Sequence, residues 1–504
     1  MRPLIAALAL AALALGLLVA FPPATDDGVP TPDDLALVAA ATSTTTTTTT
    51  STTTTTTSTV PPFSGWVDPA TFGRPWSDTV EGLLTFRGNP TRSWYGEGPV
   101  PASPRVLWRF PDAAMCSPSS VGGEVITWCG TGWTGQPAVF ERDGRTWVAV
   151  GAYSRKVHFL DADTGERLLP DFPTGDIIKG SVTVDPDGYP LLYTGSRDNY
   201  FHVVALDRDE PTELWRLSAH EVSPTLWNDD WDGSALVIDD YLFEGGENSQ
   251  FHIVKLNRGY DADGLVTVDP ELVFHAPGWD DELLAAVGRN VSIENSVAIS
   301  GDTVYFANSG GLVQGWDIAG LKDGIEPTRV FRYWVGDDVD ASIVVDDEGM
   351  LYVGAEYERG TERSREVGQI VKLDPSRPDD PRVWGVDARP RLDSGVWATL
   401  GLVDDLVIAP TDTGEVFGVD RFTGEVRWTK KLPGPTWSSP VIVDGIWIQG
   451  DCAGFLRGFD VSDTSVEPVE VWKVELGGCI ESTPAVWRGH IVVGTRAGFV
   501  YGLG

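Results

Sequence analysis

The stretch "GVDRFTGEVRW", residues 418–428, indicates how this 504-residue chain folds. It places Asp420, Thr423, Gly424 and Trp428 at fixed intervals. An aspartate carboxylate can accept backbone N–H bonds across a turn, and a glycine supplies the positive φ that a tight bend needs. The stretch therefore predicts two antiparallel strands joined by a tight turn, with the tryptophan on the outer strand.

The same pattern, an apolar strand that ends in Asp or Asn, recurs along the chain. Its steps are 40 to 60 residues long, and it ends at Asp161, Asp207, Asn257, Asp317, Asp374, Asp420 and Asp460. Two further apolar runs precede each position, most clearly in residues 438–460. Four antiparallel strands in roughly 40–50 residues make one blade of a β-propeller.

The two ends of the repeat region predict how the propeller closes. The last unit, residues 482–504, has three strands but no fourth, whereas "RVLWRF", residues 105–110, is an unused outer strand with Trp108 in the tryptophan position. Pairing the two removes the open sheet edges. We therefore predict an all-β fold: a single eight-bladed β-propeller with four-stranded antiparallel blades, closed by an N-terminal outer strand that joins the C-terminal blade.

Residues 418–428 resemble the tryptophan-docking motif Ala-x-Asp-x-x-Thr-Gly-x-x-x-Trp of the pyrroloquinoline-quinone (PQQ) repeat propellers, with Gly418 at the Ala position. The resemblance covers about residues 105–504. That group includes exported bacterial proteins, quinoprotein dehydrogenases that use PQQ and calcium, and a lipoprotein scaffold of outer-membrane barrel assembly. The dehydrogenases carry adjacent cysteines and this chain has none, which argues against PQQ. The resemblance implies the fold and leaves the activity open.

The chain divides into four predicted parts. Residues 1–21 form a signal peptide or a retained signal anchor, because Arg2 precedes an unbroken apolar run. Residues 22–60 form a disordered linker with a Thr/Ser-rich stalk, residues 61–104 a pre-propeller segment, and residues 105–504 the propeller. We expect a protein that is secreted or anchored to the cell membrane by its N-terminal helix, and that contacts the membrane through this segment alone.

The formal charge of -36 restricts the partners. Such a surface repels phosphate backbones, so nucleic acid is excluded as a partner, and it attracts cations. The remaining classes of partner are a protein, a glycan or a small molecule. We expect the protein itself to be a monomer.

Polar residues at the starts and ends of the inner strands indicate a site at one mouth of the channel. Aligned strand starts begin at Cys116, Lys179, Asp232, Glu294, Asp340, Trp397, Ser438 and Ser482. The far ends of the second strands add Arg197, Glu247, Asn308 and Glu356, and nearby loops add Asp229, Asp230, Asp337 and Asp338. A ring of oxygen ligands suits a hard cation such as Ca²⁺.

We therefore assign two sets of candidate residues and no catalytic residue. The candidate metal ligands are Asp232, Glu247, Glu294, Asp340 and Glu356, and the candidate cofactor-binding residues are Lys179, Arg197 and Asn308. The same residues also fit turn-capping side chains on an acidic protein, so this alternative stays open. The hypothesis is an exported or surface-tethered binding or scaffold module; the alternative is a quinoprotein-like oxidoreductase with PQQ and Ca²⁺.

The four cysteines predict two disulfides, since an even number in an exported chain is typical of paired thiols. The repeat alignment predicts Cys116–Cys129 within the first blade and Cys452–Cys479 between the seventh and eighth blades.

Overall fold

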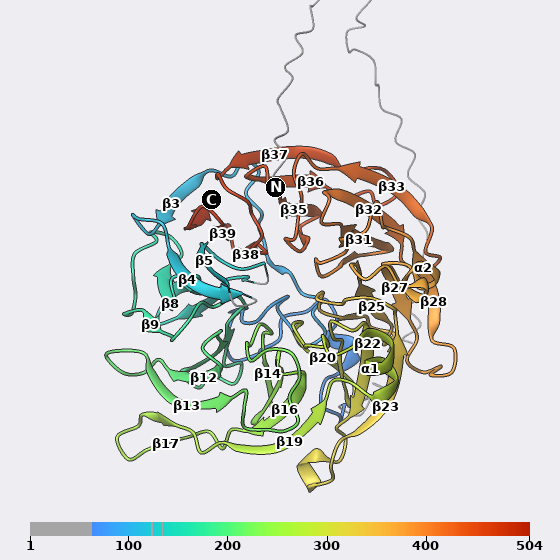
Figure 1. Ribbon diagram of the computed structural model, residues 1–504. Coiled ribbons are helices and arrows are strands. Elements are labelled where there is room, and N and C mark those ends of the chain that lie inside the picture. Colours follow the sequence, from blue (N-terminus) through green and yellow to red (C-terminus); the bar gives the residue numbers. More distant parts are fainter. Residues whose placement is uncertain (1–62, 122–123, 134) are drawn as a thin grey trace, which may run out of the picture. The chain divides into compact units, whose positions relative to one another are not determined.

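Eight sheets of four or five strands surround one central axis (Figure 1) in the computed structural model, which describes residues 63–504 except 122, 123 and 134. Apolar side chains of neighbouring sheets pack face to face; for example, Val313 and Phe331 share a buried cluster with Val353 and Leu373. The predicted eight-bladed propeller is confirmed. The predicted signal segment, residues 1–21, and linker, residues 22–60, lie outside the described residues.

Blades 2 to 7 each have four strands in chain order. Blade 2 consists of β10 (Thr183–Val184), β11 (Leu191–Gly195), β12 (Tyr200–Ala205) and β13 (Thr212–Ser218), and blade 3 of β14 (Leu236–Ile238), β15 (Tyr241–Gly245), β16 (Gln250–Lys255) and β19 (Glu271–Pro277). Blade 4 consists of β20 (Ala298–Ser300), β21 (Thr303–Phe306), β22 (Leu312–Asp317) and β23 (Thr328–Trp334), and blade 5 of β24 (Val344–Val345), β25 (Leu351–Gly354), β27 (Ile370–Leu373) and β28 (Arg382–Val386). Blade 6 consists of β30 (Gly401–Val403), β31 (Leu406–Pro410), β32 (Glu415–Asp420) and β33 (Val426–Lys431), and blade 7 of β34 (Val441–Val443), β35 (Ile446–Gly450), β36 (Phe455–Asp460) and β37 (Val469–Glu475).

Short elements decorate the loops between these strands. Two small two-stranded sheets pair β17 (Gly259–Tyr260) with β18 (Val266–Thr267) and β26 (Glu356–Tyr357) with β29 (Ser394–Gly395). The helices of the described residues are η1 (Pro69–Thr71), α1 (Asp281–Val287), η2 (Leu321–Asp323) and α2 (Glu362–Val367).

The turn between β32 and β33 shows why the repeat has an aspartate and a glycine at these positions. Asp420 Oδ1 accepts hydrogen bonds from the backbone N–H groups of Phe422 (3.0 Å) and Thr423 (2.7 Å), and Gly424 has a φ of 77°. The tryptophan of the preceding blade, Trp384, lies against Gly424, where a Cβ atom would come within 2.7 Å of it. Each turn of this kind thus receives a tryptophan from the blade before it.

The ring closes as the sequence predicts. In blade 8, β38 (Ala485–Trp487), β39 (His490–Thr495) and β40 (Phe499–Leu503) pair in order, and β40 then pairs antiparallel with β3 (Val106–Phe110). Trp108 faces Gly502 across this pair, and its indole N–H donates to the carbonyl of Ala162 in blade 1 at 2.7 Å. The N-terminal strand therefore completes blade 8 and joins it to blade 1.

Blade 1 differs from the prediction at its inner strand. Cys116 lies in β4 (Cys116–Val121), which pairs only with β5 (Glu124–Cys129) in a separate hairpin. The blade itself consists of β6 (Ala138–Arg142), β7 (Arg145–Ala152), β8 (Lys156–Asp161) and β9 (Phe172–Pro173), and β1 (Gly82–Leu83) adds to β6. The predicted Cys116–Cys129 and Cys452–Cys479 disulfides are both present, but the first staples the hairpin rather than the blade.

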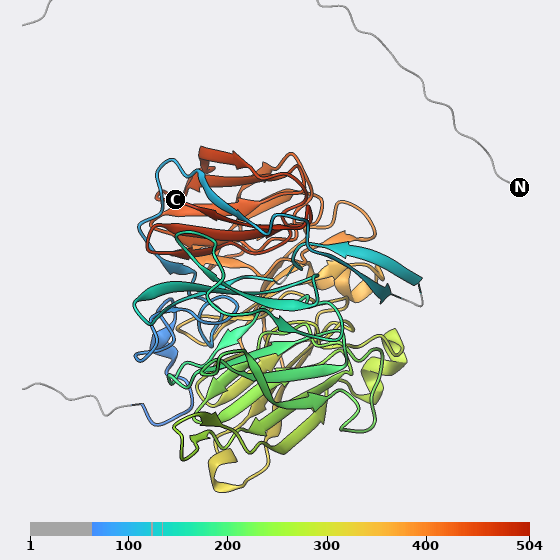
Figure 2. The ribbon, with the colours of Figure 1, turned by 90° about the vertical axis from the view of Figure 1, so that its left-hand side faces the viewer.

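Residues 84–95, which we call the axial segment, cross the inner strands of the ring. Two of its arginines are fully buried: Arg87 donates to the carbonyls of Leu400 (2.5 Å) and Pro440, and Arg92 to those of Val297 (2.8 Å) and Ser234 (2.6 Å). The N-terminal part of the described chain, drawn in blue, runs along the side of the ring opposite the β4–β5 hairpin (Figure 2). Nearby, β2 (Gly96–Glu97) pairs parallel with β38.

Candidate functional site

A ring of hydroxyl groups links the inner strands of neighbouring blades and aligns the starts of those strands. The Ser234 N–H donates to Ser296 Oγ (2.9 Å), and the Ser296 N–H donates to Ser342 Oγ (2.9 Å). The same bond joins Gln136 to Ser181, Ser342 to Thr399, Thr399 to Ser439, and Ser439 to Thr483.

This ring corrects the alignment made from the sequence. Counting two residues back from each hydroxyl residue gives the column Lys179, Asp232, Glu294, Asp340, Trp397, Trp437 and Glu481. Ser438 and Ser482 were therefore placed one residue too late, and Cys116 lies outside the column, in the β4–β5 hairpin. The acidic positions of the predicted column keep their places.

Paired charges form the first part of the mouth, which we call the lysine cluster: Lys179, Arg197, Asp230, Asp232 and Glu247. Lys179 Nζ lies 2.7 Å from Glu247 Oε1 and 3.7 Å from Asp230 Oδ2, and it also pairs with Asp232. Arg197 pairs with Asp230, and Asn228 Nδ2 donates to Glu247 Oε2 at 2.7 Å. The two basic groups therefore compensate most of the negative charge of this cluster.

The pKa values in the lysine cluster follow from burial and from these pairs. Burial alone would lower the pKa of Lys179, but Asp232 and Glu247 outweigh it and raise that pKa well above its ordinary value. Burial and the charge of Glu247 raise the pKa of Asp230 to about 7. Lys179 therefore stays protonated, and the cluster can exchange a proton near neutral pH.

The second part of the mouth, which we call the acid triad, is Asp338, Asp340 and Glu356. These residues are 7%, 9% and 4% exposed, and one carboxylate oxygen of each lies within 4.8 Å of the others. The basic group near them is Arg359, whose Nη1 is 3.5 Å from Asp338 Oδ2 and 3.5 Å from Asp337 Oδ1. Within the described part of the chain, Oδ1 of Asp338 and Oδ1 of Asp340 have no hydrogen-bond partner.

Backbone contacts position Asp338 and Glu356 of the triad. The Glu356 N–H donates to the carbonyl of Asp338 at 2.8 Å, and Glu356 in β26 faces Gly395 in β29. Gly395 has a φ of 129°, and a Cβ atom there would lie 2.6 Å from the Cα of Glu356. The buried Asp337 accepts from the N–H groups of Arg359 (3.0 Å) and Gly360 (2.9 Å), which ties the two loops together.

The acid triad can carry its charge only with a partner. Burial, followed by the charge of Glu294, raises the pKa of Asp338 and of Asp340 well above their ordinary range. Burial and the neighbouring Asp340 raise the pKa of Glu356 in the same way. Ca²⁺ binds oxygens at roughly 2.3–2.6 Å, so two of its ligands can be up to about 5 Å apart. The triad thus has the spacing to share one ion.

Glu294 lies between the two clusters. Its carboxylate accepts hydrogen bonds from Ser292 Oγ (2.6 Å) and Ser309 Oγ (3.1 Å), and its charge acts on both Asp232 and Asp338. The structure therefore brings the five candidate metal ligands to one mouth, together with Asp230 and Asp338, which the sequence placed in the surrounding loops.

Asn308 has another position. Its Oδ1 accepts from the N–H groups of Gly310 (3.0 Å) and Leu312 (2.9 Å), and its Nδ2 donates to the carbonyl of Gly278 (2.5 Å). It caps the turn before β22, so its amide faces the backbone and not the carboxylates. Sequence spacing did not distinguish this turn position from a mouth position.

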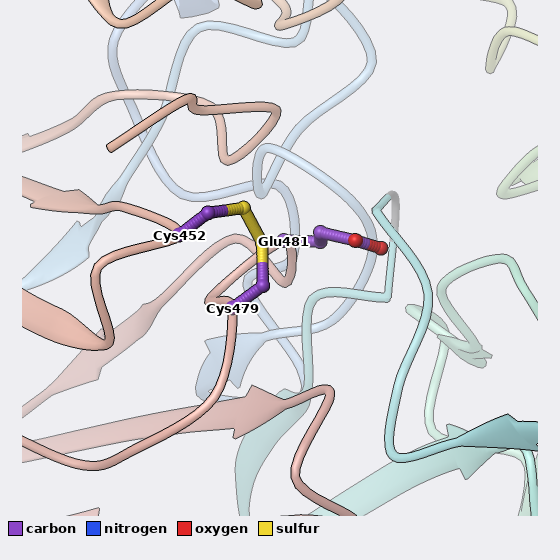
Figure 3. A group of neighbouring side chains, drawn as sticks. All are labelled: Cys452, Cys479 and Glu481. Atoms are coloured by element: carbon purple, nitrogen blue, oxygen red, sulfur yellow. A yellow bond between two sulfur atoms is a disulfide. The ribbon is translucent and has the colours of Figure 1, made fainter. Parts of the chain in front are cut away.

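Glu481 belongs to the same column on blade 8. Its carboxylate accepts from Arg496 Nη1 at 2.9 Å and extends away from the neighbouring Cys452–Cys479 disulfide (Figure 3). Because Arg496 compensates its charge, Glu481 is a natural control for the acid triad.

Comparison with known proteins agrees with this architecture. Residues 366–503 match the family model described as outer membrane protein assembly factor BamB. The chain carries PQQ-type propeller repeats. The resemblance inferred from residues 418–428 is thereby confirmed, while the match covers the C-terminal part of the chain. None of the curated proteins compared with the chain matches it.

Solved structures share the fold at low sequence identity. BamB from Moraxella catarrhalis is 16% identical with a TM-score of 0.50, and the alignment covers 79% of this chain and 97% of that one. Quinohemoprotein alcohol dehydrogenases from Comamonas testosteroni (13% identical, TM-score 0.53) and Pseudomonas putida HK5 (10%, 0.54) each align over 84% of this chain and 80% of theirs. Among the described residues, no helix is long and apolar enough to cross a membrane.

Proposed function

We propose that the protein is an exported binding or scaffold module whose acidic mouth holds a divalent cation, Ca²⁺, at the acid triad. One observation carries this proposal: Asp338, Asp340 and Glu356 are buried within 4.8 Å of one another, and Arg359 approaches only one of them. Desolvated charges cost several kcal/mol each unless they are compensated. A bound cation would compensate all three at once.

The ligand chemistry favours Ca²⁺ over Mg²⁺. Ca²⁺ accepts about six to eight oxygen ligands in flexible geometry, whereas Mg²⁺ demands a near-octahedral site and retains several waters. Carboxylates that come from a loop and from a short strand, with Glu294 beside them, supply such an irregular oxygen set.

A calorimetric titration of CaCl₂ into the chelator-treated protein tests the proposal. We expect one site in the wild type and a loss of affinity of at least about tenfold in Asp340→Asn and in Glu356→Gln. Glu481→Gln, which changes a mouth carboxylate already paired with Arg496, should bind as the wild type does. Equal heats in the wild type and in the double variant Asp340→Asn/Glu356→Gln would contradict the proposal.

The oxidoreductase alternative has less support from the residues of the mouth. PQQ is an anionic tricarboxylate and needs positive charge around it. Lys179 and Arg197 are already engaged by Asp230, Asp232 and Glu247, and the charge that lacks a partner is negative. These residues do not fit PQQ. We therefore expect no dye reduction with alcohols or aldose sugars after PQQ and Ca²⁺ are added.

Export is the second element of the proposal. The apolar N-terminal run and the two disulfides support it, because disulfides persist in oxidising compartments. Fractionation of cells that express the full chain should recover it outside the cytoplasm, and deletion of residues 1–21 should retain it in the cytoplasm with reduced cysteines.

A further inference from the structure

We infer that an open pocket beside the mouth, formed around Trp227, binds a carbohydrate. The pocket has a volume of about 440 Å³ and is lined by His220, Thr225, Leu226, Trp227, Asn228, Asp229 and Arg289. Small-molecule sites range from about 300 to 1,000 Å³. The inference names a ligand class for the proposed binding function and rests on it in placing binding at this mouth, but it is carried by different residues.

Trp227 is exposed and its backbone is strained, which argues that its side chain contacts a ligand. The residue is 59% exposed, and its φ is 69°, a region that bulky residues avoid. The neighbouring backbone is fixed, since the Leu226 N–H donates to the carbonyl of Asn248 (3.1 Å) and the Asn228 N–H to that of Glu247 (3.2 Å). Strain of this kind persists where the surroundings impose it, often at ligand sites.

An indole held in this way presents a flat apolar face to solvent. The C–H face of a pyranose ring is the complementary surface, and aromatic rings combine such apolar contact with a polar edge. The ring therefore supplies a stacking platform at the pocket.

The polar residues around the platform suit hydroxyl groups. Asp229 and Asn228 offer acceptor oxygens, and His220 Nε2 lies 3.3 Å from Asp229 Oδ2. Arg289 forms no ion pair with a carboxylate in the part of the chain that the structure describes, so its donors are available. Vicinal sugar hydroxyls both donate and accept, which matches this mixture. A phosphate or another polyanion would instead meet Asp229 and the acidic mouth.

Both walls of the pocket are anchored on the charged clusters. Asn228 Nδ2 donates to Glu247 Oε2 in the lysine cluster at 2.7 Å. Arg359 Nη2 donates to the carbonyl of Asn290, next to Arg289, at 3.4 Å, while its Nη1 approaches Asp338 of the acid triad. Arg359 therefore links the wall that carries Arg289 to the acid triad.

Saturation-transfer NMR on the full chain tests the inference with a panel of glucose, galactose, mannose, N-acetylglucosamine and their disaccharides at millimolar concentration. We expect transfer to at least one sugar, a loss of affinity of at least about tenfold in Trp227→Ala, and partial retention in Trp227→Phe. Phe422→Ala removes another exposed aromatic ring, 56% exposed, and should leave binding unchanged.

A second variant separates binding from folding. Trp227→Gly relieves the positive φ, so its thermal midpoint should equal or exceed that of the wild type while sugar binding is lost. No transfer to any sugar of the panel, or unchanged binding in Trp227→Ala, would overturn the inference. Sugar binding without a calcium heat would remove only the cation proposal, and a calcium heat without sugar binding would remove only this inference.

Discussion

At the scale of single residues, the repeat is a contact between a tryptophan and a glycine on the neighbouring strand. Trp428 faces Gly418 across the β32–β33 pair, and a Cβ atom at Gly418 would lie 2.0 Å from the indole. Trp472 lies over Gly458, and Trp108 over Gly502, in the same way. The glycine at a motif position usually held by alanine therefore follows from the ring that covers it.

Substitution of this glycine tests the contact. Gly418→Ala should lower the free energy of unfolding by about 1–3 kcal/mol, because the added methyl overlaps a buried indole that cannot leave its slot. Gly259→Ala is the matched control, since its nearest neighbour to a new Cβ is 3.6 Å away. Guanidinium unfolding measures both, and equal midpoints for the two variants would refute the packing argument.

The acid triad predicts how stability depends on pH. Burial raises the folded-state pKa of Asp338, Asp340 and Glu356, so the cation-free folded state keeps protons that the unfolded chain has already lost. The free energy of unfolding should therefore fall as the pH rises above about 4, through the raised pKa values. Ca²⁺ should restore it at neutral pH.

Guanidinium unfolding from pH 5 to 8, in chelator and in CaCl₂, measures this effect. We expect the steeper loss in chelator and a shallower slope in Asp340→Asn, which has no charge to bury. Identical slopes with and without CaCl₂ would contradict the prediction.

At the scale of strands and blades, the sequence predicted the repeat well where each strand of a blade corresponds to a single apolar run. Residues 105–161 contain an additional pair of strands, β4 and β5, and local apolar pattern does not reveal which strands join a ring. The hydroxyl ring reveals which strands join the propeller, because Gln136, and not Cys116, forms the hydrogen bond to blade 2. For the same reason the sequence located the mouth acids but not the division into two clusters, which depends on which cation each carboxylate meets.

The two disulfides should differ in their effect on stability. Cys452–Cys479 closes a loop of 27 residues between β35 and β38, two blades of the ring, so its removal as Cys452→Ser/Cys479→Ser should lower the free energy of unfolding by about 3 kcal/mol. Cys116–Cys129 staples a hairpin that pairs with no blade, so Cys116→Ser/Cys129→Ser should leave the main thermal transition in place. Calorimetry of both double variants gives the comparison; a larger loss from the hairpin variant would contradict it.

At the scale of the whole molecule, the N-terminal part of the described chain closes and stabilises the ring of blades. β3 supplies the outer strand of blade 8, and the axial segment inserts Arg87 and Arg92 among carbonyls of blades 3, 4, 6 and 7 or the loops that lead into them. The toroid and the geometry of its mouth thus depend on residues that lie outside the repeats.

A chain that begins at residue 111 tests this dependence. It would expose the edge of β40 and leave buried carbonyls without donors, so we expect it to unfold at lower temperature and to associate through the open edge. Adding a peptide of residues 63–110 in trans should restore the monomer and the thermal midpoint, whereas the same peptide with Arg87→Ala and Arg92→Ala should restore β3 pairing but not full stability. Size exclusion and circular dichroism follow the two effects separately. A truncated chain as stable and as monomeric as the full one would mean that the ring does not need β3 and the axial segment to stay closed.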